Sequence, residues 1–468
     1  MSAIAPNSLA ARDIAYALHP YTDPRQHEEK GPLVITEGHG IWVRDSEGRE
    51  YIEGLAGLWC TSLGFSEKRL VEAARRQLDR LPYTHLFAGR SSEPVIELAE
   101  SLARLAPEPL RQRCRVFFTN SGSEAVDTAI KLVWYYNNAR GLPEKKRIIG
   151  RRRAYHGVTV AASHLTALDY TRAGFDLPMR HLFFELTTPS LYRDGFPGES
   201  EEAFADRLAH EFETLVRALG PETVAAFIAE PVIGAGGVVV PPAGYFTKIR
   251  PLLEKYDILM IADEVICGFG RTGNWWGSET FDIRPDLMTI AKQLSSAYQP
   301  IGAVLLSQPV YEAIADYAHR LGNFGTGYTY GGHPVAAAVA LETLRIYEQD
   351  RILDHVRTVA PHFQERLMAL GQHPLVGEAR GVGLIGAIEL VQNKAARTPF
   401  DPALRMNARV VAKAMERGLI VRPLVCDTIG ICPPLIISAA EIDLLFDRLE
   451  GAVEAVWQEL SAGTAPCS

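Results

Sequence analysis

The chain has 468 residues, of which 47% are hydrophobic and 22% charged, with a formal net charge of -8 at pH 7. This length predicts one large domain and a smaller companion, and the composition is that of a globular protein. The charge argues against a nucleic-acid partner, no apolar run approaches the ~18 residues of a membrane span, and the six cysteines lack the spacing of metal knuckles. We therefore predict a cytoplasmic protein with reduced thiols, no metal and no membrane partner.

The N-terminal 60 residues are predicted to lie apart from the main sheet. The stretch Gly40 to Gly54 places apolar residues on both sides of the turn Asp45-Ser46-Glu47-Gly48, which is typical of a β-hairpin. We assign residues 1–70 to an N-terminal segment that joins a smaller domain formed by the end of the chain.

From about residue 115, short apolar runs alternate with amphipathic stretches, which predicts an α/β fold with a large mixed, mostly parallel sheet. Six runs are expected to be buried strands, at 116–119, 147–150, 224–229, 258–262, 287–291 and 302–306. Ser123 to Asn138 has apolar residues at three- and four-residue spacing, so we expect a helix packed on this sheet. The large domain is predicted at 71–335. A smaller α+β domain is predicted at 336–468, with a strand region at 384–390 and a final helix from Ala439.

Four sequence features follow predicted strands, at the edge where open α/β sheets bind ligands. The first, Asn120 to Glu124, opens the amphipathic helix. Gly122 permits a tight turn, Ser123 can cap the helix, and free N–H groups at a helix N-terminus bind phosphate, although such a sequence is usually only a cap. The second, Asp263-Glu264, places two carboxylates at a strand tip, where a cation such as a protonated pyridine nitrogen would offset their burial. A metal ligand or a strand-end cap is the alternative.

The third feature is Lys292, which a buried strand delivers to the same edge. Partial burial lowers the pKa of a lysine and makes it a Schiff-base nucleophile and proton carrier, although a lone lysine after a strand is more often simply exposed. The fourth is Tyr155-His156-Gly157, whose aromatic ring could stack on a flat cofactor or pack in the core.

These motifs resemble those of the class III aminotransferases of pyridoxal 5′-phosphate (PLP) fold type I. The resemblance rests on Asp263-Glu264-Val265, on the glycine-rich stretch Gly268 to Gly273, and on Lys292 after its strand, and it covers nearly the whole chain. Within that family the chain is similar to ω-transaminases that use pyruvate as amino acceptor.

The resemblance implies a role for each matching residue at the cofactor. Lys292 would be the Schiff-base lysine and proton shuttle, and Asp263 would pair with the pyridine nitrogen. The other cofactor-binding residues would be Ser121, Gly122 and Ser123 at the phosphate, Tyr155 and Val265 on the ring faces, His156, Glu230 on the hydroxyl side, and Thr329. Thr329 would reach the phosphate from the partner subunit, which makes a homodimer the minimal active unit.

The resemblance also implies how substrates bind. Arg422 would grip the carboxylate of the keto acid and swing away for an apolar amine. Aromatic and apolar residues would line the substrate pockets: Tyr21, Leu58, Trp59, Phe87 and Tyr155. Gln293 and Gln299 depart from the residues common in relatives, which affects the expected substrate range and not the reaction type.

Two alternatives stand beside a ping-pong transaminase that moves an amino group from a primary amine or ω-amino acid to an α-keto acid. Gly381 to Gly386 formally matches a dinucleotide-binding fingerprint with Asp401 downstream, but these glycines precede an apolar run instead of following a strand. The other alternative keeps PLP and changes the reaction to that of an aminomutase or a decarboxylase.

Overall fold

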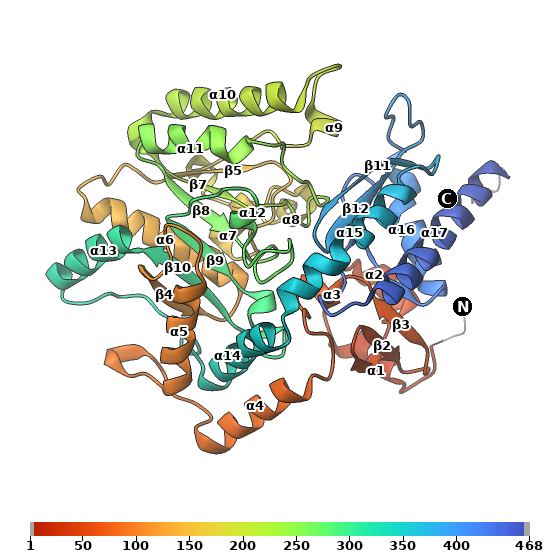
Figure 1. Ribbon diagram of the computed structural model, residues 1–468, viewed down its shortest axis with the longest axis horizontal. Helices are drawn as coiled ribbons and strands as arrows, with labels where there is room; N and C mark the ends of the chain where they lie inside the picture. Colours follow the sequence, from red (N-terminus) through yellow and green to blue (C-terminus); the bar gives the residue numbers. More distant parts are fainter. Residues whose placement is uncertain (1–3, 463–468) are drawn as a thin grey trace.

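The computed structural model describes residues 4–462, and a seven-stranded sheet lies at the centre of its larger part (Figure 1). The strand order is β4-β10-β9-β8-β7-β5-β6. The strands are β4 (Cys114–Thr119), β5 (Arg147–Arg151), β6 (Phe183–Leu186), β7 (Val224–Ala229), β8 (Leu259–Asp263), β9 (Leu287–Ile290) and β10 (Gly302–Ser307). The strands from β6 to β9 pair in parallel, and β10 is antiparallel to both β9 and β4. The predicted mixed, mostly parallel sheet is therefore confirmed.

All six predicted strands are present, with ends that differ by one or two residues. Their residues are almost all buried because both faces of the sheet are covered, which is why they appear as continuous apolar runs. Strand β6, an edge strand of four residues with two half-buried positions, was not predicted from the sequence. A short edge strand buries too little surface to need an apolar run.

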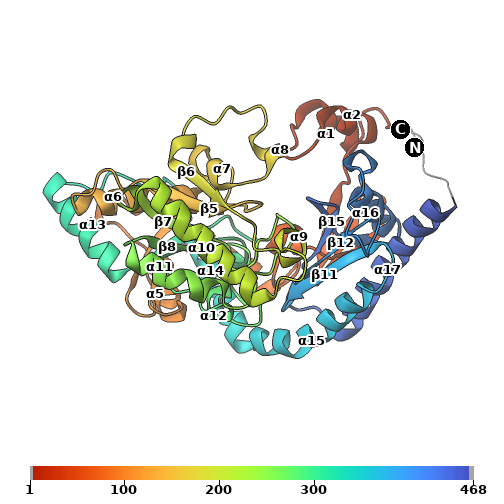
Figure 2. The ribbon, with the colours of Figure 1, turned by 90° about the horizontal axis from the view of Figure 1, so that it is seen from above.

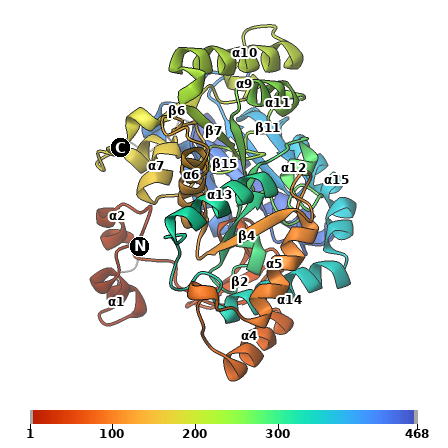
Figure 3. The ribbon, with the colours of Figure 1, turned by 90° about the vertical axis from the view of Figure 1, so that its left-hand side faces the viewer.

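Helices cover the sheet on both faces. One face carries α6 (Gly122–Ala139), α7 (Val160–Leu165) and α13 (Gln308–Leu321), and Figure 3 shows α6 beside α13. The other face carries α5 (Glu93–Leu105), α10 (Glu201–Leu219) and α11 (Tyr245–Lys255). Successive strand residues pack into different cores, as the two-residue period of a strand requires.

The smaller part of the molecule joins both ends of the chain through two four-stranded sheets. The first has the order β1-β2-β3-β13, from β1 (Ile35–His39), β2 (Trp42–Asp45), β3 (Glu50–Glu53) and β13 (Leu419–Ile420). The second has the order β11-β12-β15-β14, from β11 (Val376–Val382), β12 (Ile385–Leu390), β15 (Thr428–Ile431) and β14 (Arg422–Leu424). The predicted hairpin is present as β2 and β3, and β13 pairs with β3 in parallel, which ties the N-terminal segment to the C-terminal residues.

The remaining helices lie around the three sheets and in the connections between the two parts of the molecule. They are α1 (Leu9–Tyr16), α2 (Pro24–Lys30), α3 (Ala56–Trp59), α4 (Lys68–Arg80), α8 (Asp169–Arg172), α9 (Leu191–Asp194), α12 (Gly277–Thr280), α14 (Pro334–Gln349), α15 (Ile352–Leu370), α16 (Met406–Glu416) and α17 (Ala439–Ser461). Figure 2 shows α1 and α2 on the same side of the molecule as α7 and α8. Within residues 4–462, no helix combines the length and apolar character needed to cross a membrane.

The glycine-rich stretch Gly381 to Gly386 forms a hairpin between β11 and β12, which pair antiparallel. Gly383 lies in its turn with φ +58°, and an added Cβ atom would come within 2.3 Å of the backbone oxygen of Arg271. A dinucleotide-binding fingerprint requires a strand, a turn and a helix, so this stretch does not have that structure.

Candidate active site

A pocket of about 100 Å³ opens at the carboxyl ends of the central strands. It is lined by Gly122, Ser123, Tyr155, His156, Gly157, Glu230, Asp263, Val265, Ile266 and Lys292. These residues follow β4, β5, β7, β8 and β9, all of which run in one direction, so their carboxyl ends meet at one edge. The structure thus brings most of the predicted site residues together. Gly157 and Ile266 are pocket residues that were not among the predicted site residues, although Gly157 belongs to the motif Tyr155-His156-Gly157 and Ile266 directly follows Asp263-Glu264-Val265.

The turn after β4 forms one end of the pocket. Helix α6 begins at Gly122, and Ser121 is its cap, because the Ser121 hydroxyl accepts a hydrogen bond from the backbone N–H of Glu124 at 3.2 Å. The expectation that Ser123 caps this helix is therefore wrong. Ser123 lies inside the first turn, where its hydroxyl accepts a hydrogen bond from the N–H of Val158 at 3.1 Å. The first turn of α6 thus faces the pocket with the free N–H groups that favour an anion.

Two glycines allow the chain segments to approach closely around this turn. Gly157 has φ +110°, and an added Cβ atom would lie 2.5 Å from the hydroxyl oxygen of Ser123. An added Cβ atom at Gly122 would lie 3.1 Å from Val265. Any larger side chain at these positions would therefore fill the pocket or push its walls apart.

Asp263 also lines the pocket and is 3% exposed. Its Oδ2 atom lies 2.6 Å from Nδ1 of His156, and its Oδ1 atom accepts a hydrogen bond from the N–H of Val265 at 3.2 Å. The Nε2 atom of His156 is buried without a hydrogen-bond partner among residues 4–462. The carboxylate is therefore held in one orientation at the pocket wall.

The neighbouring carboxyl, Glu264, has a different environment. It accepts hydrogen bonds from the N–H of Gly277 at 3.0 Å and from the N–H and hydroxyl of Ser278 at 2.5 and 2.6 Å. Burial raises its pKa to about 7. Successive strand residues point to opposite faces, so Asp263 faces the pocket while Glu264 supports the start of α12.

The raised pKa of Glu264 predicts a pH dependence of stability. A carboxyl whose pKa is higher in the folded state stabilises the protein at low pH, and this contribution falls as the pH rises from about 4.5 to about 7. Between about pH 5 and pH 8 the wild type should lose about 2.5 kcal/mol more unfolding free energy than Glu264→Gln, which cannot ionise. Urea unfolding of both proteins at one chain concentration measures this difference, and parallel pH profiles would contradict it.

Lys292 directly follows β9, whose Thr289 pairs with Asp263 of β8. Its backbone has φ +47°, a left-handed conformation that is costly for a residue with a Cβ atom and is often found at functional sites. Burial lowers the pKa of its amine, whereas the negative charge of Asp263 acts in the opposite direction. Lys292 keeps some exposure because its side chain lines the pocket.

Gln293 lies behind Lys292 and points away from the pocket. Its Nε2 atom donates hydrogen bonds to the carbonyls of Ile266 and Gly268, both at 2.8 Å, and its Oε1 atom accepts one from Arg271 at 3.3 Å. It therefore connects the loop after Asp263 with the loop that carries Lys292. This departure from the family pattern leaves the pocket lining unchanged, since Gln293 is fully buried among these partners.

The third acid of the pocket, Glu230, is 3% exposed. It accepts hydrogen bonds from the N–H of Tyr155 at 3.0 Å and from the N–H of Gly234 at 2.9 Å. Burial raises the pKa of Glu230 and also that of Tyr155. The hydroxyl of Tyr155 lies 3.1 Å from that of Tyr21, which extends the site toward the N-terminal segment.

Arg422 begins β14 and approaches the same pocket from the smaller part of the molecule. The positive charge of Arg422 lowers the pKa of Tyr155, which partly offsets the increase caused by burial. The same charge lowers the pKa of Lys292. Trp59 is 2% exposed and lies against Gly430 of β15, where an added Cβ atom would come within 3.1 Å of its ring. Neither residue lines the pocket itself, and both belong to or contact the second of the smaller sheets.

The other predicted residues do not line the pocket of the single chain. Leu58 is 52% exposed and Phe87 is 45% exposed. Thr329 is exposed too, and its carbonyl accepts a hydrogen bond from the hydroxyl of Tyr83 at 2.8 Å. The pocket lining of the single chain therefore lacks these three side chains, and it also lacks Tyr21, Trp59, Ser121 and Arg422.

The family model described as aminotransferase class-III matches residues 24–453. The chain belongs to the class III aminotransferases. This aminotransferase is 48% identical over 428 residues to gamma aminobutyrate transaminase 1, mitochondrial, from Solanum lycopersicum, covering 92% of this chain and 82% of the relative. Among solved structures, it is similar to the ω-transaminase from Pseudomonas jessenii in complex with PMP, with a TM-score of 0.95, 50% identity and coverage of 97% and 100%. A thermostable 6-fold mutant of that organism's ω-transaminase gives a TM-score of 0.94 at 51% identity, covering 96% and 99%.

The aminotransferase therefore has the fold type I architecture and uses PLP, as its sequence predicted. Its pocket fits that cofactor. The free N–H groups of α6 suit a phosphate, the close approach of Gly122 and Val265 leaves a narrow space, and Asp263 offers a buried carboxylate. The unpaired Nε2 atom of His156 is a further polar group on the pocket wall.

Proposed function

We propose that this aminotransferase transfers the amino group of a primary amine or ω-amino acid to an α-keto acid such as pyruvate, in two half-reactions that share one pocket. One observation carries the proposal: the carboxylate of Asp263 at the end of β8 and the amine of Lys292, just after the neighbouring parallel strand β9, line the same pocket. A panel of amine donors with pyruvate, followed by the absorbance of the cofactor, tests it.

The chain's residues would hold PLP at its phosphate and around its ring. Ser121, Gly122 and Ser123 would bind its phosphate at the first turn of α6. The ring would lie between Val265 and Tyr155, with Asp263 at its nitrogen, Glu230 on its hydroxyl side and His156 supporting Asp263. When bound, PLP supplies an electron sink for negative charge that develops on the substrate carbon.

Lys292 is the group that moves protons in this proposal. Burial lowers its pKa, so a fraction of the amine is neutral at lower pH than in an exposed lysine. Its Nζ atom would accept the proton from the carbon that bears the amino group. Because the backbone at Lys292 is fixed in a left-handed turn, the amine has a defined position relative to Asp263.

Arg422 would bind the carboxylate of the keto acid, since its guanidinium fork matches a carboxylate and its charge reaches Tyr155 and Lys292. We expect Arg422→Ala to raise the KM for pyruvate about 10- to 100-fold, as loss of a charged hydrogen bond implies. The half-reaction with an apolar amine should change less than about threefold, because that substrate has no carboxylate. Single-turnover absorbance separates the two half-reactions, and an equal loss in both would reject this role.

The same variant helps to identify the amine donor. The names of the plant relatives point to γ-aminobutyrate, whose carboxylate would need a cation in the donor half-reaction as well. If such an ω-amino acid is the donor, Arg422→Ala should weaken its use along with that of pyruvate. The half-reaction with an aromatic amine that has no carboxylate should not be weakened.

The proposal includes a homodimer in which Thr329 reaches the phosphate of the partner subunit's cofactor. It is supported by the exposure of Thr329 in the single chain and by its position outside the pocket. We also propose a cytoplasmic location, which is supported by the free cysteines among residues 4–462. Cys467 lies outside the described residues.

A further inference from the structure

The N-terminal segment contains a cluster of three side chains of the types that bind transition metals. Asp13 lies in α1, His27 lies in α2, and His19 lies in the connection between these helices. Their ligand atoms all lie within 4.8 Å of one another, and within residues 4–462 this is the only such group of three close enough to share one ion. The cluster was not predicted from the sequence.

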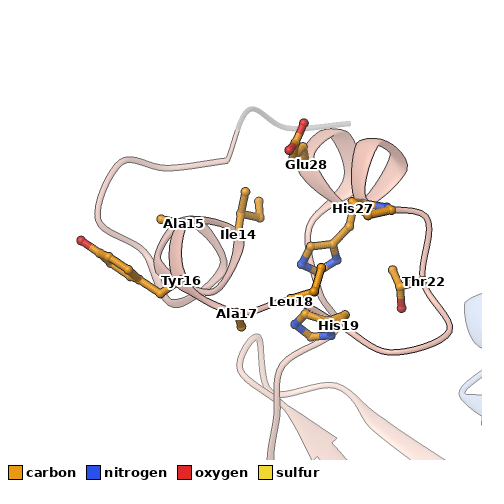
Figure 4. A pocket seen from close by; sticks show the side chains of 10 residues that line it. Ile14, Ala15, Tyr16, Ala17, Leu18, His19, Thr22, His27 and Glu28 are labelled. Atoms are coloured by element: carbon orange, nitrogen blue, oxygen red, sulfur yellow. The ribbon is translucent and has the colours of Figure 1, made fainter. Parts of the chain in front are cut away.

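The geometry of the cluster is that of a site with one shared centre. The Nε2 atom of His19 lies 2.8 Å from Oδ2 of Asp13, and the Nε2 atom of His27 lies 2.9 Å from the same oxygen. The two imidazole rings are side by side, with centroids 4.3 Å apart (Figure 4). Three ligand atoms therefore converge on one small volume.

We propose that Asp13, His19 and His27 form a binding site for a divalent transition-metal ion, with Zn²⁺ as the expected occupant. Two imidazoles and one carboxylate are ligands that zinc prefers. Zinc ligands at about 2.0–2.2 Å in a tetrahedron lie about 3.3 Å apart, so each Nε2 atom has to move from Oδ2 of Asp13 by only about 0.5 Å. Each imidazole would then carry its ring proton on Nδ1 and present a lone pair at Nε2.

The surroundings of the cluster admit an ion and a water molecule. The side chain of His27 is 10% exposed, that of Asp13 is 26% exposed and that of His19 is 34% exposed. A pocket of about 280 Å³ adjoins both histidines, and Figure 4 shows their rings at its wall. The fourth ligand of the ion would be water from this pocket.

A metal ion would stabilise a segment that has little apolar packing of its own. Helices α1 and α2 have eight and seven residues, and no residue of either helix is buried in the single chain. Isolated helices of this length are marginal in water. An ion bound by residues of both helices and of their connection would cross-link the segment, as structural metals do in small folded units.

The cross-link would also bear on the active site through Tyr21. In the sequence, Tyr21 lies between the ligands His19 and His27. Its hydroxyl contacts the hydroxyl of Tyr155. Its ring packs edge to face against the ring of Tyr170 in α8, with the two ring centroids 6.1 Å apart. An ion bound by residues on both sides of Tyr21 would restrict the motion of this residue, which contacts Tyr155 of the pocket. The segment would thus act as a metal-stabilised cover beside the site.

The test uses the full-length PLP-loaded enzyme without a histidine tag, since a tag binds the same ions. The protein is treated with a chelator, exchanged into metal-free buffer and titrated with Zn²⁺ in competition with a chromophoric chelator. We expect one zinc ion per chain to bind more tightly than any other. His27→Ala and Asp13→Asn should weaken this ion by more than about 100-fold. The matched control His210→Ala, which removes an exposed imidazole from α10, should leave it unchanged.

Hydrogen exchange gives a second measurement. Zn²⁺ should slow amide exchange within residues 9–30 of the wild type and of His210→Ala, and should have no effect there in the two ligand variants. If His27→Ala fails to fold, Asp13→Asn decides, because it keeps the size of the side chain. Equal zinc binding by the wild type and a folded ligand variant would overturn the proposal. The three side chains would then form a hydrogen-bonded cluster that does not bind zinc.

Discussion

Lys292→Ala is expected to lower the rate of amino transfer by more than about 10⁴-fold, because it removes both the covalent attachment of the cofactor and the proton carrier. Lys292 is placed for both tasks by the end of β9 and by its left-handed backbone. Alanine keeps the Cβ atom and the same backbone restriction, so the fold should be preserved. Turnover of an amine with pyruvate gives the rate, and the absorbance of the protein-bound cofactor reports the loss of the covalent link.

Two controls distinguish this chemical loss from damage to the protein. Lys248→Ala removes a lysine of α11 that pairs with Asp206 far from the pocket lining, and it should retain wild-type turnover. A small primary amine added to Lys292→Ala should restore part of the activity, since it can carry the proton in place of Nζ. Turnover of Lys292→Ala near the wild-type rate would refute the assignment of Lys292.

Asp263→Asn is expected to lower the rate of the half-reactions by about 10²–10³-fold, the usual effect of removing one charge that stabilises a transition state in a buried site. Asparagine has nearly the same shape, and its one amide oxygen can still accept the hydrogen bond from His156, at the cost of the bond from the N–H of Val265. The change therefore removes the negative charge and leaves the packing intact. Single-turnover rates with an amine, measured at saturating PLP, separate this effect from weaker cofactor binding.

Glu264→Gln is the matched control because it makes the same chemical change at the next residue. Glu264 contacts Gly277 and Ser278 instead of the pocket, so its variant should keep activity within about threefold of the wild type and alter only the pH dependence of stability. Similar losses of activity in Asp263→Asn and Glu264→Gln would show that Asp263 has no special role at the cofactor.

The sequence by itself determined the α/β sheet and the edge where the site lies. Parallel strands buried on both faces require continuous apolar runs, and these runs are visible without a structure. Residues that follow such strands gather at one edge, so Gly122, Tyr155, Asp263 and Lys292 could be grouped in advance. The family resemblance then indicated the reaction.

Only the tertiary structure decided how individual side chains are used. The serine that caps α6, the acid of the pair Asp263-Glu264 that faces the pocket, and the partners of Gln293 all depend on backbone direction, which changes from one residue to the next. The short strands β6, β13 and β14 depend on neighbours distant in sequence, because pairing and not local pattern stabilises them. The cluster of Asp13, His19 and His27 likewise forms only when the chain turns between α1 and α2 and brings three irregularly spaced side chains to one point.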